Sequence, residues 1–180
     1  MVLSVVKMRS YAKRVWDIAF SHGWHDTRLS DMGYIGLAMT EVSEAINADR
    51  KNRSYPQLPD ISTMNDADFQ AFYDTNVKDT VETEIADVVI RLVDYAYLKW
   101  GDNMDWLHGY ESRPDSAKSF LDVGTYLMKY VLFPERPYVV NGITYCYEWA
   151  NLLGFDLDKH IECKIRYNDL RPYRHGNKKY

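Results

Sequence analysis

Four acidic residues with a repeated spacing are the residues in this sequence best suited to chemistry. Glu41 and Glu44 lie three positions apart, and Glu84 and Asp87 repeat that spacing farther along the chain. Residues three apart on an α-helix project from the same side, so each pair would present two carboxylates together. If the two helices pack antiparallel, all four acids converge between them. Such an all-oxygen cluster suits Mg²⁺ or Mn²⁺, which retain several waters and are usually bridged to substrate phosphates.

The helix predicted for the first acid pair covers residues 34–50, where apolar residues recur at helical spacing. Glu41 and Glu44 are both expected on its apolar face, and Asp31 is expected to cap it. A buried carboxylate is costly unless it is paired, and this face of the helix carries no Lys or Arg. A cation from another part of the chain must therefore neutralise the pair.

The second acid pair lies in an amphipathic segment, 80–100, that Gly101 terminates. Its apolar stripe marks a core-facing helix, and Glu84 and Asp87 are expected at the border between core and solvent. Because two carboxylates placed there repel each other, this helix also requires a compensating cation.

Basic residues near the C-terminus provide positive charge. Lys164 and Asn168 are four apart on a predicted helix that begins after Asp156, so they share a face. The segment that follows, 171–180, begins with Arg171 and contains two arginines, two lysines and a histidine. Such a segment is well suited to a phosphate chain, and the alternative interpretation is a solvated basic tail.

Two aromatic rings, Trp24 and His25, occupy the short loop 23–31 between the first two predicted helices. They are placed to stack on a flat ligand. The alternative is that Trp24 only closes the end of the bundle, which is a common role for a large aromatic side chain.

The remaining elements follow from periodicity and from turn-forming residues. Helices are predicted over 3–22 and 65–73 and from Pro114 to Val131. Asn141-Gly142 between short β-rich runs predicts a hairpin that ends by Tyr145, with a helix over 143–153 as the alternative. The fold class is therefore all-α, and we expect a single domain, 1–180.

Composition excludes several classes of protein. With 180 residues, 46% hydrophobic and 27% charged, the chain has the composition of one ordinary globular domain. The net charge of −4 argues against general nucleic-acid binding, and no apolar run is long enough for a membrane span. Cys146 and Cys163 have neither zinc nor disulfide spacing, so we expect a cytoplasmic protein. There is no Gly-rich phosphate loop, and no Glu-x-x-His pair of the di-iron type.

The two acidic segments, LAMTEVSEA (37–45) and ETEIADVVIRLVD (82–94), resemble the all-α NTP pyrophosphohydrolases of the MazG-like family. The signature of that family is Glu-x-x-Glu on one helix and Glu-x-x-Asp on the next. The C-terminal segment, 157–180, is also similar to that of compact members. The resemblance covers residues 1 to 100, most loosely at 55–76, and resumes near Tyr147.

This resemblance implies a helical homo-oligomer, dimer or tetramer, that uses Mg²⁺ to hydrolyse a nucleoside triphosphate to the monophosphate and pyrophosphate. The metal ligands that it implies are Glu41, Glu44, Glu84 and Asp87. Either Glu41 or Glu44 would act as the catalytic general base. The substrate-binding residues that it implies are Lys164, Asn168 and Arg171. Trp24 and His25 fall where the family often places residues that contact the nucleobase.

Two departures from the family leave alternatives open. Thr40 precedes Glu41 where some members have a second acid, so the number of metal ions is open. The resemblance implies a bundle of four to five helices, and segment 101–145, which has no counterpart in compact members, would be an insertion between the last two core helices. One alternative is a narrower enzyme of the same superfamily, specific for dUTP, dCTP or phosphoribosyl-ATP. The other is a non-catalytic helical module that binds a protein through 101–145.

Overall fold

The computed structural model describes residues 4–103, 105 and 119–174, and all regular elements among them are helical. A 3₁₀ turn (Ile61–Thr63) precedes the short helix at 66–72, and a π-helical turn (Tyr73–Val77) follows that helix. The all-α prediction is thus confirmed. In chain order the helices are α1 (Val5–Ser21), α2 (Asp31–Arg50), α3 (Asp66–Phe72), α4 (Val81–Trp100), α5 (Phe120–Tyr130), α6 (Arg136–Leu153) and α7 (Leu157–Asp169).

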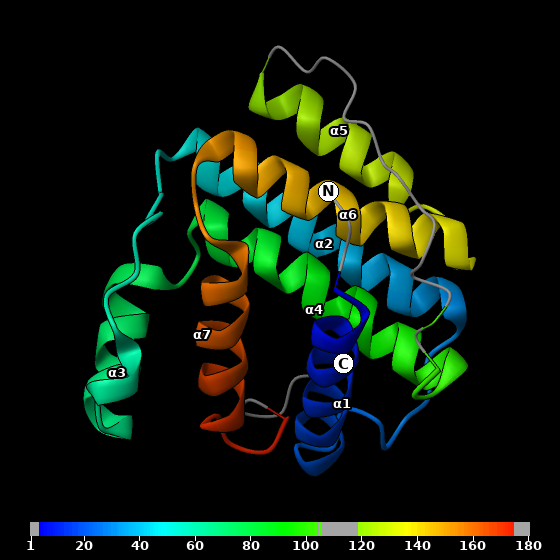
Figure 1. Ribbon diagram of the computed structural model, residues 1–180, viewed down its shortest axis with the longest axis horizontal. Helices are drawn as coiled ribbons and strands as arrows, with labels where there is room; N and C mark the ends of the chain where they lie inside the picture. The colour runs from blue at the N-terminus through cyan, green and yellow to red at the C-terminus, as the bar shows by residue number, and fades with distance from the viewer. Residues whose placement is uncertain (1–3, 104, 106–118, 175–180) are drawn as a thin grey trace.

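Helices α2 and α4 run antiparallel through the middle of the molecule (Figure 1). Their opposite ends are joined: Lys99 near the end of α4 pairs with Asp31 at the start of α2. At the other end, the Val81 N–H donates to the carbonyl of Arg53 at 3.0 Å. This antiparallel packing is the arrangement in which the acid pairs of the two helices were expected to converge.

The ends of these helices are set by local capping. The N-cap of α2 is Ser30, whose hydroxyl accepts from the Gly33 N–H at 3.1 Å, so the prediction that Asp31 is the cap was wrong by one residue. Thr80 caps α4 in the same way, and Gly101 ends it with a positive φ of 67°. Both helices therefore begin and end close to where the sequence indicates.

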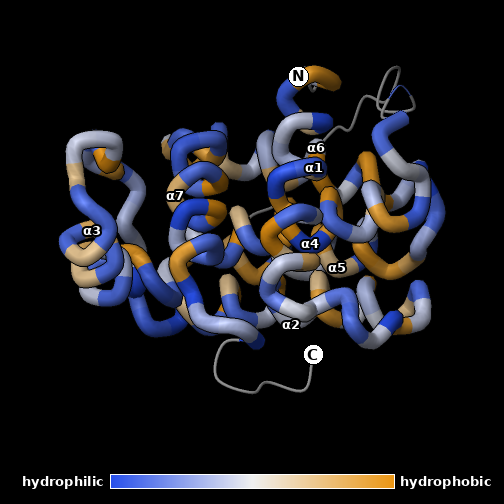
Figure 2. Tube along the Cα trace, turned by 90° about the horizontal axis from the view of Figure 1, so that it is seen from below, coloured by the Kyte–Doolittle hydropathy of each residue, from blue (hydrophilic) through white to orange (hydrophobic). Residues whose placement is uncertain are grey.

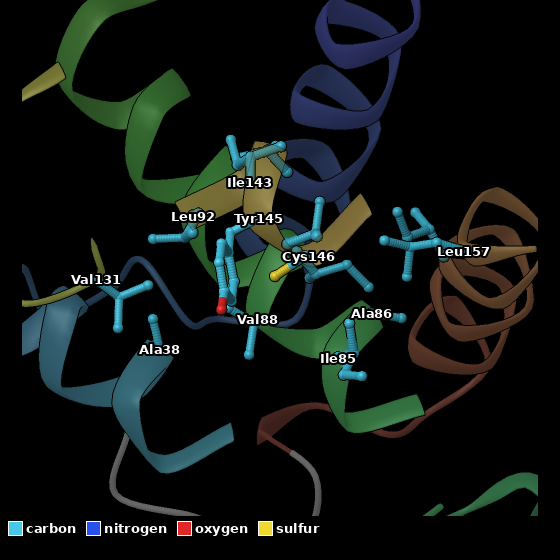
Figure 3. Close-up of a cluster of buried hydrophobic side chains, with 14 of the residues drawn as sticks. Ala38, Ile85, Ala86, Val88, Leu92, Val131, Ile143, Tyr145, Cys146 and Leu157 are labelled. Carbon is cyan, nitrogen blue, oxygen red and sulfur yellow. The ribbon is translucent and has the colours of Figure 1, made fainter. Parts of the chain in front are cut away.

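The hydrophobic core is organised around α4, whose side chains are buried on nearly all sides. Figure 3 shows Val88 and Leu92 of α4 meeting Ile143 and Cys146 of α6, with Ala38 of α2 nearby. None of the helices that the structure describes combines the length and the apolar character needed to cross a bilayer.

The segment predicted as a hairpin is instead the first half of a helix. α6 runs without interruption from Arg136 to Leu153, with Pro137 in its first turn. Gly142 lies inside it because α6 approaches its neighbours closely there: a Cβ on Gly142 would lie 2.9 Å from Leu92 Cδ1. The local turn preference of Asn-Gly is thus overridden by tertiary packing.

Helix α5 begins at Phe120, with Ser119 as its N-cap. The earlier part of the helix predicted to start at Pro114 lies outside the described residues. α5 packs against α2 and α6, and a Cβ on Gly124 would lie 2.6 Å from Ile46 Cδ1. The described part of segment 101–145 therefore contributes to the same core as α2 and α4.

Helix α3 lies at one edge of the molecule, next to α7 (Figures 1 and 2). It packs there through a second, smaller hydrophobic cluster, in which Tyr73 stacks on Tyr167 with ring centroids 3.9 Å apart. On its other side α7 packs against α4, where Lys164 pairs with Asp87 of the second acid pair.

Candidate functional site

Three of the four predicted acids lie together between α2 and α4. Oxygen atoms of Glu41, Glu84 and Asp87 all lie within 4.8 Å of one another. The expectation that two helices bring their carboxylates together is confirmed for these three residues. Glu84 and Asp87 are only 4% and 7% exposed, so they do not lie at the border with solvent as expected. The reason is that α7 covers this end of α4.

Glu44 is not part of this acidic triad. It occupies an exposed position on α2, so the prediction that it lies on the buried face was wrong. Three residues of α-helix rotate a side chain by about 60° relative to its starting direction, and this carries Glu44 to the edge of the stripe that buries Glu41. Glu44 still lines the same cleft as the triad.

A cleft of about 720 Å³ contains the triad and takes its lining from α1, α2, α4 and α7. It brings together acidic, basic and aromatic side chains that are far apart in the sequence. The predicted site residues that line it are Glu41, Glu44, Glu84, Asp87, Lys164, Asn168, Arg171 and Trp24.

Two cations neutralise the acids, as the sequence required. Lys164 Nζ of α7 lies 2.5 Å from Asp87 Oδ2, and the two side chains are 13% and 10% exposed. Arg91 of α4 donates from Nε to Glu41 Oε1 at 2.9 Å. Sequence reasoning missed Arg91, although its position four residues after Asp87 places it on the same face of the helix.

The triad has three carboxyl groups against these two cations. Burial first, and then the charge of Asp87, raise the pKa of Glu84 to about 9, against the opposing effect of Lys164. Burial also raises the pKa of the Asp87 carboxyl, against the opposing effect of Lys164. For Lys164, burial lowers the pKa, but the charges of Asp87, Tyr73 and Glu84 and the hydrogen bond to Asp87 together outweigh it, and the net shift is upward.

Asn168 of α7 and Arg171, which follows that helix, line the same cleft as the triad. The buried Asn168 Oδ1 has no hydrogen-bond partner among the described residues. The Arg171 guanidinium lies over the Tyr167 ring, 5.6 Å from its centroid, and the Arg171 carbonyl lies 2.7 Å from His22 Nε2. The predicted basic segment continues through 175–180, which lies outside the described residues.

The predicted aromatic pair lies together in an adjoining side pocket of about 130 Å³. Trp24 lines both this pocket and the cleft, whereas His25 lines the side pocket alone. His25 Nε2 lies 3.1 Å from Asp94 Oδ1, and its ring stacks on Trp16 with centroids 4.1 Å apart. Asp94, which sequence reasoning also missed, lines both cavities.

These donor groups fit a hard divalent cation. Carboxylate oxygens are the ligands that Mg²⁺ and Mn²⁺ prefer, and three of them converge here from two rigid helices. Comparison with protein-family models, with curated proteins and with solved structures finds no match to this chain.

Proposed function

We propose that this chain is a Mg²⁺-dependent nucleoside triphosphate pyrophosphohydrolase, which converts an NTP or dNTP and water to the monophosphate and pyrophosphate. The observation that carries the proposal is the convergence of Glu41, Glu84 and Asp87 oxygens within 4.8 Å in a cleft that also contains Lys164 and Arg171. Carboxylates that can hold a cation and basic side chains that can bind phosphates therefore line the same cavity. The resemblance of both acidic motifs to the MazG-like family supports the same activity.

The triad residues Glu41, Glu84 and Asp87 would hold the Mg²⁺ ion, and Mn²⁺ would be able to replace it. When bound, such an ion neutralises charge on the phosphate oxygens and on the transition state. Glu84 must release its proton for the site to accept the cation, because a carboxylate binds metal in its ionised form.

Glu44 is the acid that we assign as the general base. It lines the cleft but lies outside the triad, so its carboxylate is available to a water molecule. The oxygen of that water would attack the α-phosphorus in line with the bond to the β-phosphate, and Glu44 would accept the proton. The bond from the α-phosphorus to the bridging oxygen breaks, and pyrophosphate leaves.

Residues of α7 and of the segment that follows it would position the phosphate chain. Lys164 and Arg171 provide charged donors, and Asn168 has an amide beside them in the same cleft. Because these groups are held by helix packing and by the stacked ring of Tyr167, they need little reorganisation during the reaction.

We further propose a cytoplasmic homo-oligomer, a dimer or tetramer. Cys146 and Cys163 are both buried free thiols, which suits a reducing compartment. Leu121 and Phe133 are 61% and 42% exposed, and apolar side chains of this size at the surface suit a contact between subunits. Chromatography with light scattering would measure the oligomeric state.

A pyrophosphate-release screen tests the activity. Wild-type protein is incubated with standard and modified NTPs and dNTPs in Mg²⁺, in Mn²⁺ and in EDTA. We expect metal-dependent release that Glu84→Gln abolishes and that Asp49→Asn, at an exposed acid of α2, leaves unchanged. Release from dUTP or dCTP alone would identify the narrower enzyme. Folded wild-type protein that releases pyrophosphate from no nucleotide would overturn the proposal.

A further inference from the structure

Four charged residues on one face of α4 line the cleft and follow one another along the helix. Glu84, Asp87, Arg91 and Asp94 follow one another at spacings of three, four and three, so they form a row of about 15 Å along the helix. Each of the last three meets a different element. Asp87 meets Lys164 of α7, Arg91 meets Glu41 of α2, and Asp94 meets His25 of the α1–α2 loop.

Arg91 lies where the two cavities adjoin, since it lines both the cleft and the side pocket. Its side chain is 41% exposed, whereas that of Lys164 is 13% exposed. Only its Nε atom is engaged, on Glu41, and within the described residues no acceptor bonds either Nη atom. The guanidinium therefore keeps donors free for an anion at this boundary.

The two cavities differ in the ligand chemistry that they suit. The side pocket combines the rings of Trp24, His25 and Tyr34 in a volume of about 130 Å³, so its aromatic walls favour a flat ring. The cleft on the other side of Arg91 carries Lys164, Arg171 and Lys78, which favour a polyphosphate.

We propose, building on the proposed function, that Arg91 binds the α-phosphate and thereby sets the direction of the nucleotide. The nucleoside then lies toward the side pocket, and the pyrophosphate half lies toward α7. In this position Arg91 also orients Glu41 through Nε, so one guanidinium links the acidic triad to the phosphate that is attacked.

A purely structural role for Arg91 makes a different prediction. If it only neutralised Glu41, a lysine would preserve the charge and nucleotide binding would survive. The planar guanidinium can donate hydrogen bonds to a carboxylate and to a phosphate at the same time, and the single ammonium group of a lysine cannot replace it. Arg91→Lys is therefore the informative variant, and Arg91→Met is its companion.

The test is calorimetric titration in EDTA, which needs neither metal nor turnover. The probes are the eight common ribonucleoside and deoxyribonucleoside monophosphates, each alone, and pyrophosphate. We expect both Arg91 variants to weaken monophosphate binding by about tenfold or more while pyrophosphate affinity stays nearly constant. Lys164→Met should do the reverse. Arg14→Met, which removes an exposed arginine paired with Glu162, should match wild type.

Three results would overturn the inference: wild-type protein that binds no monophosphate, Arg91→Lys that retains wild-type monophosphate affinity, or Arg91 variants that weaken pyrophosphate equally. Circular dichroism of each variant verifies that it is folded. Because binding is measured apart from hydrolysis, wild-type protein that binds as expected but releases no pyrophosphate would refute the proposed function and support the assignment of Arg91 as a phosphate ligand.

Discussion

Lys164 Nζ lies 2.5 Å from Asp87 Oδ2, and this ion pair joins α7 to α4 inside the cleft. Both side chains are largely buried, so solvent screens their charges little and each depends on the other. Two residues assigned to the metal and to the substrate are therefore also part of what holds α7 in place.

We predict that removing one member of this pair destabilises the protein more than removing both. Asp87→Ala leaves a buried ammonium without its partner, and the free energy of unfolding should fall by about 3–5 kcal/mol. The double variant Asp87→Ala/Lys164→Met should recover most of that loss. Urea unfolding in EDTA measures all three proteins, and a double variant as unstable as Asp87→Ala would contradict the prediction.

The two glutamates of the first motif should have separable effects. Glu44→Gln should lower kcat by about 10²- to 10⁴-fold, the usual contribution of a general base, with Mg²⁺ affinity unchanged. Glu41→Gln should weaken Mg²⁺ binding, because Glu41 is in the triad and Glu44 is not. Titration of Mn²⁺ followed by paramagnetic resonance, together with steady-state rates, separates the two. Equal loss of metal affinity in both variants would remove Glu44 from its assigned role.

Without metal, the protein should lose stability as the pH rises. The pKa of Glu84 is raised from 4.5 to about 9, by burial first and then by the charge of Asp87, so the folded state keeps a proton that the unfolded chain loses. The corresponding stability is present below about pH 4.5 and is lost as the pH rises through about 9. Glu84→Gln should flatten this dependence when unfolding is followed from pH 5 to 9 in EDTA. An unchanged slope would show that Glu84 does not titrate in this way.

Two glycines offer a matched test of how α5 packs. A Cβ on Gly124 would lie 2.6 Å from Ile46 Cδ1, so Gly124→Ala should destabilise the protein by about 1–3 kcal/mol. Gly36 lies in α2 with nothing within 4 Å of such a Cβ, and Gly36→Ala should stabilise by up to about 1 kcal/mol. Thermal unfolding compares the two variants. Equal shifts in melting temperature would contradict the close packing of α5 against Ile46.

The sequence by itself was sufficient for the elements that have strong local signals. α2 and α4 begin and end near their predicted positions because caps such as Thr80 and stops such as Gly101 act within one turn. The acidic spacing also predicted a shared site, because an unpaired buried carboxylate such as Glu41 requires a partner from another element.

Only the tertiary structure decided the rest. Whether Asn141-Gly142 turns or continues as a helix depends on Leu92, which is far away in the sequence and leaves no room for a side chain on Gly142. The pairing of Arg91 with Glu41, the separation of Glu44 from the triad and the side pocket at Asp94 likewise arise from the way helices rotate and pack against one another. Periodicity shows which residues share a face of a helix. The packing of the whole core decides which helix faces contact one another.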